Sequence, residues 1–85
     1  MQIELELFGA LRGLEANDRL RLDVSGKCVS DLRAAVVHHA VAHWPGMASG
    51  LLTRCAFATD SSVLRDGESL PSDGRMAVLP PVSGG

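Results

Sequence analysis

One helix-forming segment lies between two groups of strand-forming segments, and this order constrains the fold more than any other feature. Before the helix, residues 2–8 and 19–24 alternate apolar and polar side chains, the period of a strand with one buried face. Asn17-Asp18 is a turn signal between them, which favours an antiparallel pair. After the helix, three further strands are predicted, at residues 54–59, 63–64 and 75–79. One helix that covers one face of a mixed sheet is an α+β architecture.

The helix is predicted from about Ser30 to about His43. Ser30 is a suitable N-cap, and Asp31 places negative charge at the positive end of the helix dipole. Pro45-Gly46 ends the helix, and Trp44 is predicted to pack at that end. The spacing predicts that one face covers the sheet, through Val29, Leu32, Val36, Ala40 and His43. Residues 47–52 are predicted to form a connector, and the pattern does not place their apolar side chains.

Turn-forming residues separate the remaining elements. A short helical turn is predicted within residues 10–17, and clusters of Asp, Ser and Gly mark turns at 60–62, 66–67 and 72–74. Leu70 is predicted to enter the core between the last two turns. The inward side chains of the first two strands are expected to be Ile3, Leu5, Leu7, Leu20, Leu22 and Val24.

Length and charge narrow the class of protein. A chain of 85 residues builds one small domain with a two-layer core. The formal net charge is -2 and the arginines are scattered, which argues against nucleic acid or an anionic membrane as a partner. No apolar run approaches transmembrane length, and no signal segment opens the chain. We therefore expect a cytoplasmic protein, with Cys28 and Cys55 as reduced thiols.

The body of the chain offers no convincing active site. His39 and His43 are neighbours on a helix and His38 is adjacent, but no third ligand stands at metal-binding spacing, so no metal site is predicted. Cys55 lies in an apolar strand, and Cys28 has no nearby base that would activate it. Catalytic chemistry in the side chains is therefore not expected.

The C-terminal segment Pro80-Pro81-Val82-Ser83-Gly84-Gly85 is the exception. The two prolines favour an extended rod, and Gly84 and Gly85 lack Cβ atoms and can pass through a narrow slot. The alternative is that this segment is a frayed tail or a remnant of cloning. We expect the α-carboxylate of Gly85 to be the functional group. Adenylation with ATP would activate it, and a sulfur nucleophile would then convert it to a thiocarboxylate.

The whole chain resembles a known family. The order of elements resembles the ubiquitin-like β-grasp, and residues 79–85 look like the tail of the small, sulfur-carrier subunits of molybdopterin synthase, in the MoaD/ThiS family. Residues 7–12 after the first strand, residues 29–33 at the helix start, and Leu70 with Asp73-Gly74 also fit. The paired prolines of the tail are the most specific part of the resemblance.

The resemblance implies a sulfur carrier of molybdenum-cofactor biosynthesis, without a bound cofactor and not an enzyme by itself. Its partners would be the large subunit of molybdopterin synthase, an adenylating enzyme resembling ubiquitin-activating enzymes, and a sulfurtransferase as sulfur donor. Sulfur would pass to cyclic pyranopterin monophosphate. Residues 1–79 would form the β-grasp domain and residues 80–85 the tail that enters the partner.

The family pattern also places Phe8 and Leu79 on an apolar patch that docks partners, while the alternative for both is ordinary core. Two residues depart from the pattern: Thr59 stands where Asn is frequent, and Arg75 stands where an acidic residue commonly follows the Asp-Gly turn.

Three other functions stay open. A sulfur carrier of thiamin biosynthesis has the same fold and a Gly-Gly end, but is typically shorter and lacks the paired prolines. A ubiquitin-like modifier would join Gly85 to a lysine of another protein. A β-grasp interaction module would use no tail chemistry at all, because this fold serves many roles.

Overall fold

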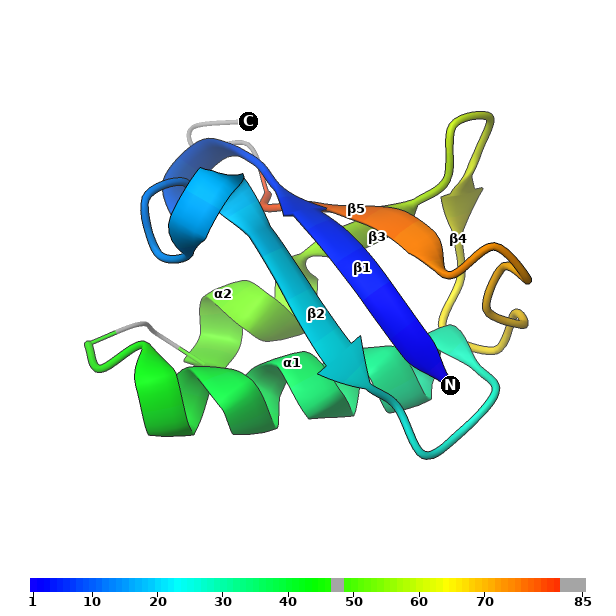
Figure 1. Cartoon of the computed structure of the whole chain (residues 1–85), viewed down its shortest axis with the longest axis horizontal. Coiled ribbons are helices and arrows are strands. Elements are labelled where there is room, and N and C mark those ends of the chain that lie inside the picture. The colour runs from blue at the N-terminus through cyan, green and yellow to red at the C-terminus, as the bar shows by residue number, and fades with distance from the viewer. Residues whose placement is uncertain (47–48, 82–85) are drawn as a thin grey trace.

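The computed structural model describes residues 1–46 and 49–81, with only the backbone of Ser49. It contains a five-stranded mixed sheet in the order β2-β1-β5-β3-β4 (Figure 1). The strands are β1 (Gln2–Leu7), β2 (Arg19–Asp23), β3 (Ala56–Ala58), β4 (Val63–Leu64) and β5 (Arg75–Leu79). Strand β1 pairs antiparallel with β2 and parallel with β5, while β3 pairs antiparallel with β5 and β4. The predicted mixed sheet, including the antiparallel first pair, is confirmed.

Helix α1 (Val29–His43) lies across one face of this sheet (Figure 1). The loop between β1 and β2 contains two short 3₁₀ helices, η1 (Gly9–Leu11) and η2 (Ala16–Asp18), in place of the predicted single turn. A second helix, α2 (Ser49–Arg54), follows α1 where a connector was predicted, and it includes Arg54, the predicted first residue of the next strand. Its Leu52 is buried against the core. Within residues 1–46 and 49–81, neither helix has the length and apolarity that crossing a bilayer requires.

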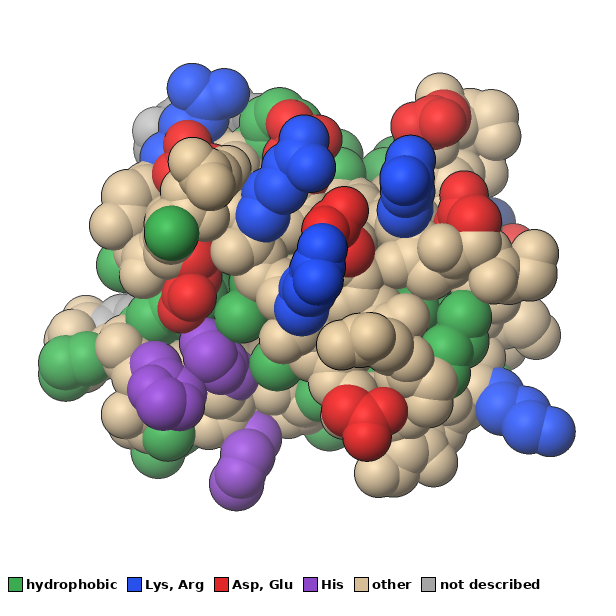
Figure 2. Space-filling model, in the orientation of Figure 1, with side chains coloured by type: hydrophobic (Ala, Val, Ile, Leu, Met, Phe, Trp, Pro, Cys, Tyr) green, Lys and Arg blue, Asp and Glu red, His purple; other side chains and the backbone are tan. Residues whose placement is uncertain are grey.

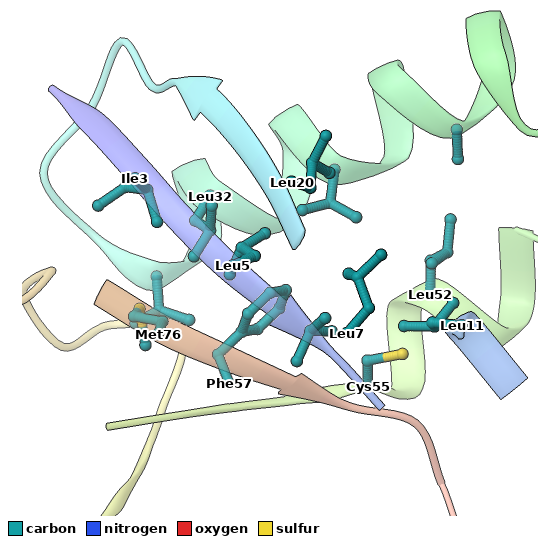
Figure 3. Close-up of a cluster of buried hydrophobic side chains, with 14 of the residues drawn as sticks. Ile3, Leu5, Leu7, Leu11, Leu20, Leu32, Leu52, Cys55, Phe57 and Met76 are labelled. Carbon is teal, nitrogen blue, oxygen red and sulfur yellow. The ribbon is translucent and has the colours of Figure 1, made fainter. Parts of the chain in front are cut away.

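The core lies between α1 and the facing side of the sheet. Figure 3 shows side chains of β1, including Leu5 and Leu7, directed with Phe57 of β3 into this layer. Leu70 is also buried, as predicted, while Leu22 is only partly buried. The buried cluster comprises Ile3, Leu5, Leu7, Leu11, Leu20, Val24, Val29, Leu32, Val36, Ala40, Trp44, Leu52, Cys55, Phe57, Leu70, Met76 and Val78.

The prediction of Ser30 as the N-cap of α1 is wrong. The helix begins at Val29, and Cys28 occupies the N-cap position. The carboxylate of Asp31 accepts hydrogen bonds from the backbone N–H groups of Cys28 and Lys27, each at 3.1 Å. An acidic side chain in the first turn therefore satisfies donors that precede the helix. The N–H groups of Val29 and Ser30 donate instead to the carbonyl oxygens of Glu68 and Asp66, each at 2.9 Å, so these donors need no hydroxyl at the cap.

The C-terminal end of α1 departs from the prediction in one residue. Trp44 is buried there, as predicted, but His43 is exposed. The buried face runs through Val29, Leu32, Val36 and Ala40, and Trp44 continues it beyond the helix. His43 lies outside, with its ring centroid 4.5 Å from that of His39. Continuing the 3.6-residue period to the last helical residue was wrong because Trp44 covers the core at this point.

Arg33 joins α1 to three other parts of the molecule. Its guanidinium Nη1 donates to the carbonyl oxygens of Leu52, at 3.1 Å, and Cys55, at 2.6 Å, next to the end of α2. Nε and Nη2 donate to the two carboxylate oxygens of Asp66, at 3.2 and 2.8 Å. The guanidinium carbon also lies 4.8 Å from the centre of the Phe57 ring. A single side chain thus holds α2 and the segment after β4 against the helix.

Candidate functional site

The C-terminal segment leaves the body directly from a central strand. Strand β5 lies between β1 and β3, and its last paired residue is Leu79, opposite Ala56. Pro80 and Pro81 follow and are partly buried. Because proline has no N–H to donate, the ladder of hydrogen bonds stops at this point. The predictions for Val82, Ser83, Gly84 and Gly85 concern residues outside those that the structure describes.

Phe8 and Leu79 lie side by side on the face of the sheet opposite α1, here called the outer face. The parallel register pairs Leu7 with Val78, so Phe8, which continues in an extended conformation, comes beside Leu79. Both Phe8 and Leu79 are partly exposed, and neither belongs to the buried core. Together with Ala56, also partly exposed, they form an apolar row across three strands, next to the point where Pro80 departs.

Arg12 is part of this region, although the sequence pattern did not single it out. Its guanidinium carbon lies 5.9 Å from the centre of the Phe8 ring, within the range of a cation–π contact. The 3₁₀ turn η1 brings the two residues together, because the N–H of Arg12 donates to the carbonyl of Gly9 at 3.1 Å. The apolar row therefore carries a positive charge at one end. The sequence signal that could have indicated this contact is the four-residue spacing of Phe8 and Arg12, with Gly9 between them.

Beyond the apolar row the outer face is polar. Figure 2 shows basic and acidic side chains intermixed over β1 and β2. Glu4 lies between two arginines, with its carboxylate oxygens 3.2 Å from Arg21 Nε and 3.8 Å from Arg19 Nη1. Farther from the tail, the small side chains of Ala58 and Ala77 line a groove of about 680 Å³, with charged residues of both signs around it, among them Glu6, Arg19, Asp60 and Arg75. The exposed ion pairs that Glu4 makes with the two arginines contribute little to stability.

His39 of α1 belongs to a structural cluster with Glu15 and Trp44. Glu15 Oε2 accepts a hydrogen bond from Trp44 Nε1–H at 2.7 Å and lies 2.9 Å from His39 Nε2. The contact with His39, aided by the Trp44 bond, holds the pKa of Glu15 below its usual range although partial burial opposes this. In residues 1–46 and 49–81, no three His, Cys, Asp or Glu side chains converge as metal ligands. The cluster fastens the β1–β2 loop to the end of α1.

The two cysteines are free thiols in different surroundings. Cys55 is 3 % exposed, and its Sγ lies 3.3 Å from the carbonyl oxygen of Leu51. Burial raises the pKa of the Cys55 thiol, so the reactive thiolate form is disfavoured. Cys28 is partly exposed at the start of α1. The expectation that Cys55 is a packing residue agrees with its burial.

Two solved structures share the fold of this chain. The crystal structure of SAMP1 from Haloferax volcanii superimposes on this chain with a TM-score of 0.69, 26% sequence identity and full coverage of both chains. A chain of the complex of subunits 1 and 2 of the molybdopterin-converting factor from Helicobacter pylori 26695 gives a TM-score of 0.55, 22% identity and full coverage of both chains. The chain has the ubiquitin-like β-grasp fold, which confirms the predicted fold class.

A match to a family pattern over most of the sequence identifies the family. The pattern of the ThiS family matches residues 5–85. The chain therefore belongs to the ThiS family, one of the ubiquitin-like sulfur carriers of the MoaD/ThiS type. Members of this kind are small carrier subunits that are generally not catalysts by themselves. A search of curated proteins found no match.

Proposed function

We propose that this protein is the sulfur carrier of molybdenum-cofactor biosynthesis and that Gly85 carries the sulfur. One observation supports this more than any other. Strand β5 leads directly into Pro80 and Pro81 beside the apolar row, in a chain whose family match extends to Gly85. A rigid segment that starts next to a partly exposed apolar surface suits a protein that docks on a partner and inserts its end into it.

The proposed chemistry takes place on the carboxylate of Gly85. A carboxylate oxygen attacks the α-phosphorus of ATP, pyrophosphate leaves, and an acyl-adenylate forms. Sulfide then attacks the carbonyl carbon, and AMP departs with the original carboxylate oxygen. The product is a thiocarboxylate with a carbon–sulfur bond. An adenylating enzyme resembling ubiquitin-activating enzymes would supply the catalytic groups. A sulfurtransferase would supply the sulfur, and a thiol that is oxidised to a disulfide would reduce its persulfide to sulfide.

The thiocarboxylate would then be used inside a larger partner. The Helicobacter pylori structure is a complex of two subunits of a molybdopterin-converting factor, and we propose an equivalent large subunit for this protein. Phe8 and Leu79 would contact that subunit while Gly84 and Gly85 enter its active site. There the sulfur would form a bond to a carbon of cyclic pyranopterin monophosphate as an oxygen leaves that carbon. Water would then cleave the resulting thioester between the carbonyl carbon and sulfur, which leaves the sulfur on the pterin and regenerates the carboxylate of Gly85. Positioning of the reacting atoms would supply much of the rate.

The thiamin pathway is the second candidate, and the match to the ThiS family supports it. Both pathways use the same activated end, so the choice rests on the paired prolines Pro80 and Pro81, which resemble the molybdopterin carriers. A ubiquitin-like modifier would use the same adenylate, but a lysine amine instead of sulfur would attack it.

Intact-protein mass spectrometry tests the carrier function. The protein is incubated with ATP, a cognate adenylating enzyme and sulfide, and we expect the mass gain for exchange of one oxygen by one sulfur. A variant without Gly85 is the matched control and should show no gain. Transfer to cyclic pyranopterin monophosphate by the reconstituted large subunit would then distinguish the molybdopterin pathway from the thiamin pathway.

Two results would contradict the proposal. An adenylating enzyme that releases pyrophosphate with this protein but yields no thiocarboxylate would exclude a sulfur carrier. A ladder of higher-mass conjugates in a cell extract, lost when Gly85 is removed, would instead identify a modifier.

A further inference from the structure

Gly9 stands where the β1–β2 loop passes the base of the tail, and its backbone is held from both sides. Strand β1 ends two residues earlier at Leu7, which is buried. On the other side Leu11 is fully buried, and its N–H donates to the carbonyl of Phe8 at 3.1 Å. Gly9 itself has φ +58°, a left-handed conformation that favours glycine. The buried neighbours on both sides therefore constrain the position of the Gly9 Cα.

The ring of Pro80 lies directly against that Cα. An ideal Cβ added to Gly9 would stand 2.9 Å from Pro80 Cγ and 3.6 Å from Pro80 Cδ. A carbon–carbon separation of 2.9 Å is shorter than the 3.5–4.0 Å optimum for two non-bonded carbons, so the ring or the loop would have to move. Only a residue without a Cβ leaves the observed space for Pro80.

Pro80 is well suited to transmit this contact. It follows Leu79, whose neighbours Ala56 and Val78 are in the paired sheet, so the start of the tail is held by the strand. The ring of Pro80 fixes its φ, and the ring of Pro81 fixes the next one. A displacement of the Pro80 ring therefore changes the direction of the following residues instead of being absorbed by free rotation about φ.

We propose that Gly9 is a positioning residue for the base of the sulfur-carrying tail: it forms a seat for Pro80 and so sets the direction in which Pro80 and Pro81 leave the sheet. This inference rests on the proposed function only in its consequence for activity. The seat itself is a structural property. The same loop carries Phe8 and Arg12 of the apolar region, so docking surface and tail base are held at a fixed mutual position.

Gly13 provides a matched control within the same loop. It also has a positive φ, +87°, but an added Cβ would meet nothing within 4 Å. Asparagine tolerates left-handed backbone better than most residues. Gly9→Asn and Gly13→Asn therefore impose a similar backbone change, and only Gly9→Asn adds a side chain against Pro80. Thermal unfolding of both variants establishes that each is folded.

The structural readout is NMR of the isolated full-length protein, which requires no partner. We expect a nuclear Overhauser effect between the Gly9 Hα atoms and the Pro80 ring. Gly9→Asn should shift the Pro80 and Pro81 resonances, and Gly13→Asn should leave them in place. Equal shifts in the two variants, or no shift in either, would contradict the proposal that Gly9 forms a seat for Pro80. This conclusion does not depend on the function of the protein.

The functional readout is the rate of thiocarboxylate formation with the adenylating enzyme. Gly9→Asn should lower kcat about tenfold with a smaller change in KM, because a misplaced reacting group loses rate more than affinity. Gly13→Asn should keep both constants. Shifted Pro80 resonances with an unchanged kcat would overturn the positioning role. A wild-type protein that forms no thiocarboxylate refutes the proposed function instead, while the NMR comparison still decides the seat.

Discussion

The two faces of the sheet differ in composition although the same strands build both. In β1 and β5 alternate residues such as Leu5 and Val78 are buried against α1, whereas Glu4 and Leu79 lie on the outer face. The inner face is apolar throughout, and its packing stabilises the domain. The outer face combines the apolar row with ion pairs that contribute little to folding. The residues that stabilise the fold and those proposed to contact a partner are therefore one residue apart along each strand, so substitutions can test them separately.

Removing one aromatic ring from each face should give the largest contrast. Phe57 is 1 % exposed in the core, whereas Phe8 is partly exposed on the outer face. We expect Phe57→Ala to lower the free energy of unfolding by about 3–5 kcal/mol, because it removes buried area and leaves a cavity. Phe8→Ala should cost less than about 1 kcal/mol. Urea denaturation followed by circular dichroism measures both, and equal losses would refute the separation of the faces.

Two arginines extend the comparison to polar groups: Arg33 lies on α1, which covers the inner face, and Arg21 lies on the outer face. Arg33→Met removes hydrogen bonds to the carbonyls of Leu52 and Cys55 and the ion pair with Asp66. We expect the free energy of unfolding to fall by about 2 kcal/mol, because partly buried carbonyls lose a charged donor. Arg21→Met on the outer face breaks only the ion pair with Glu4 among its described contacts and should cost less than about 0.5 kcal/mol. Thermal melts measure both variants, and a lower melting temperature for Arg21→Met than for Arg33→Met would contradict this prediction.

The Glu15 cluster predicts a dependence of stability on pH. Because the folded state lowers the pKa of Glu15, ionised Glu15 stabilises the fold above the ordinary pKa of glutamate. That contribution is lost as the pH falls through the lowered pKa of the folded state. Glu15→Gln should cost about 1 kcal/mol at neutral pH and progressively less in acid. Trp44 is the only tryptophan, so its fluorescence reports unfolding at each pH. A pH-independent difference between the two proteins would refute the assignment.

At the apolar row a small effect on folding is expected together with a larger effect on binding. Phe8→Arg should change the unfolding midpoint little, because the side chain is partly exposed. It should weaken binding to the large subunit about tenfold or more, as expected for an aromatic residue at a docking surface. Calorimetric titration measures the affinity, with Arg21→Met as a control elsewhere on the same face. Unchanged affinity for Phe8→Arg would remove the apolar row from the interface.

Most of the secondary structure was predictable because alternation and helical period depend on local sequence. The strands around Ile3, Leu20 and Phe57 and the main body of α1 were found in this way. One error lies at an element end, and another is a short helix that was missed altogether. Ser30 was predicted as the cap because hydroxyls favour that position, but the helix begins one residue earlier and the N–H of Ser30 donates to the carbonyl of Asp66. Helix α2 was missed because six residues carry too little periodicity to separate a short helix from a loop.

The candidate site was predicted only in part. The tail from Pro80 onward was recognisable because glycine and proline restrict or release the backbone by themselves. Phe8 and Leu79 were selected through the family resemblance, and nothing in their local sequence places them together. The contact of Arg12 with Phe8 and the role of Glu15 in holding His39 and Trp44 were not predicted. Each depends on how the β1–β2 loop folds back, which no local pattern specifies.

The sequence by itself therefore determined most of the elements, their order and the buried residues of the main strands, and it supplied the prediction for Gly85. These follow from side-chain period and from the properties of single residues. Only the tertiary structure decided that β1 lies parallel beside β5, which brings Phe8 next to Leu79 and Gly9 against Pro80. Strand register depends on contacts between residues far apart in the chain, and no local pattern contains that information.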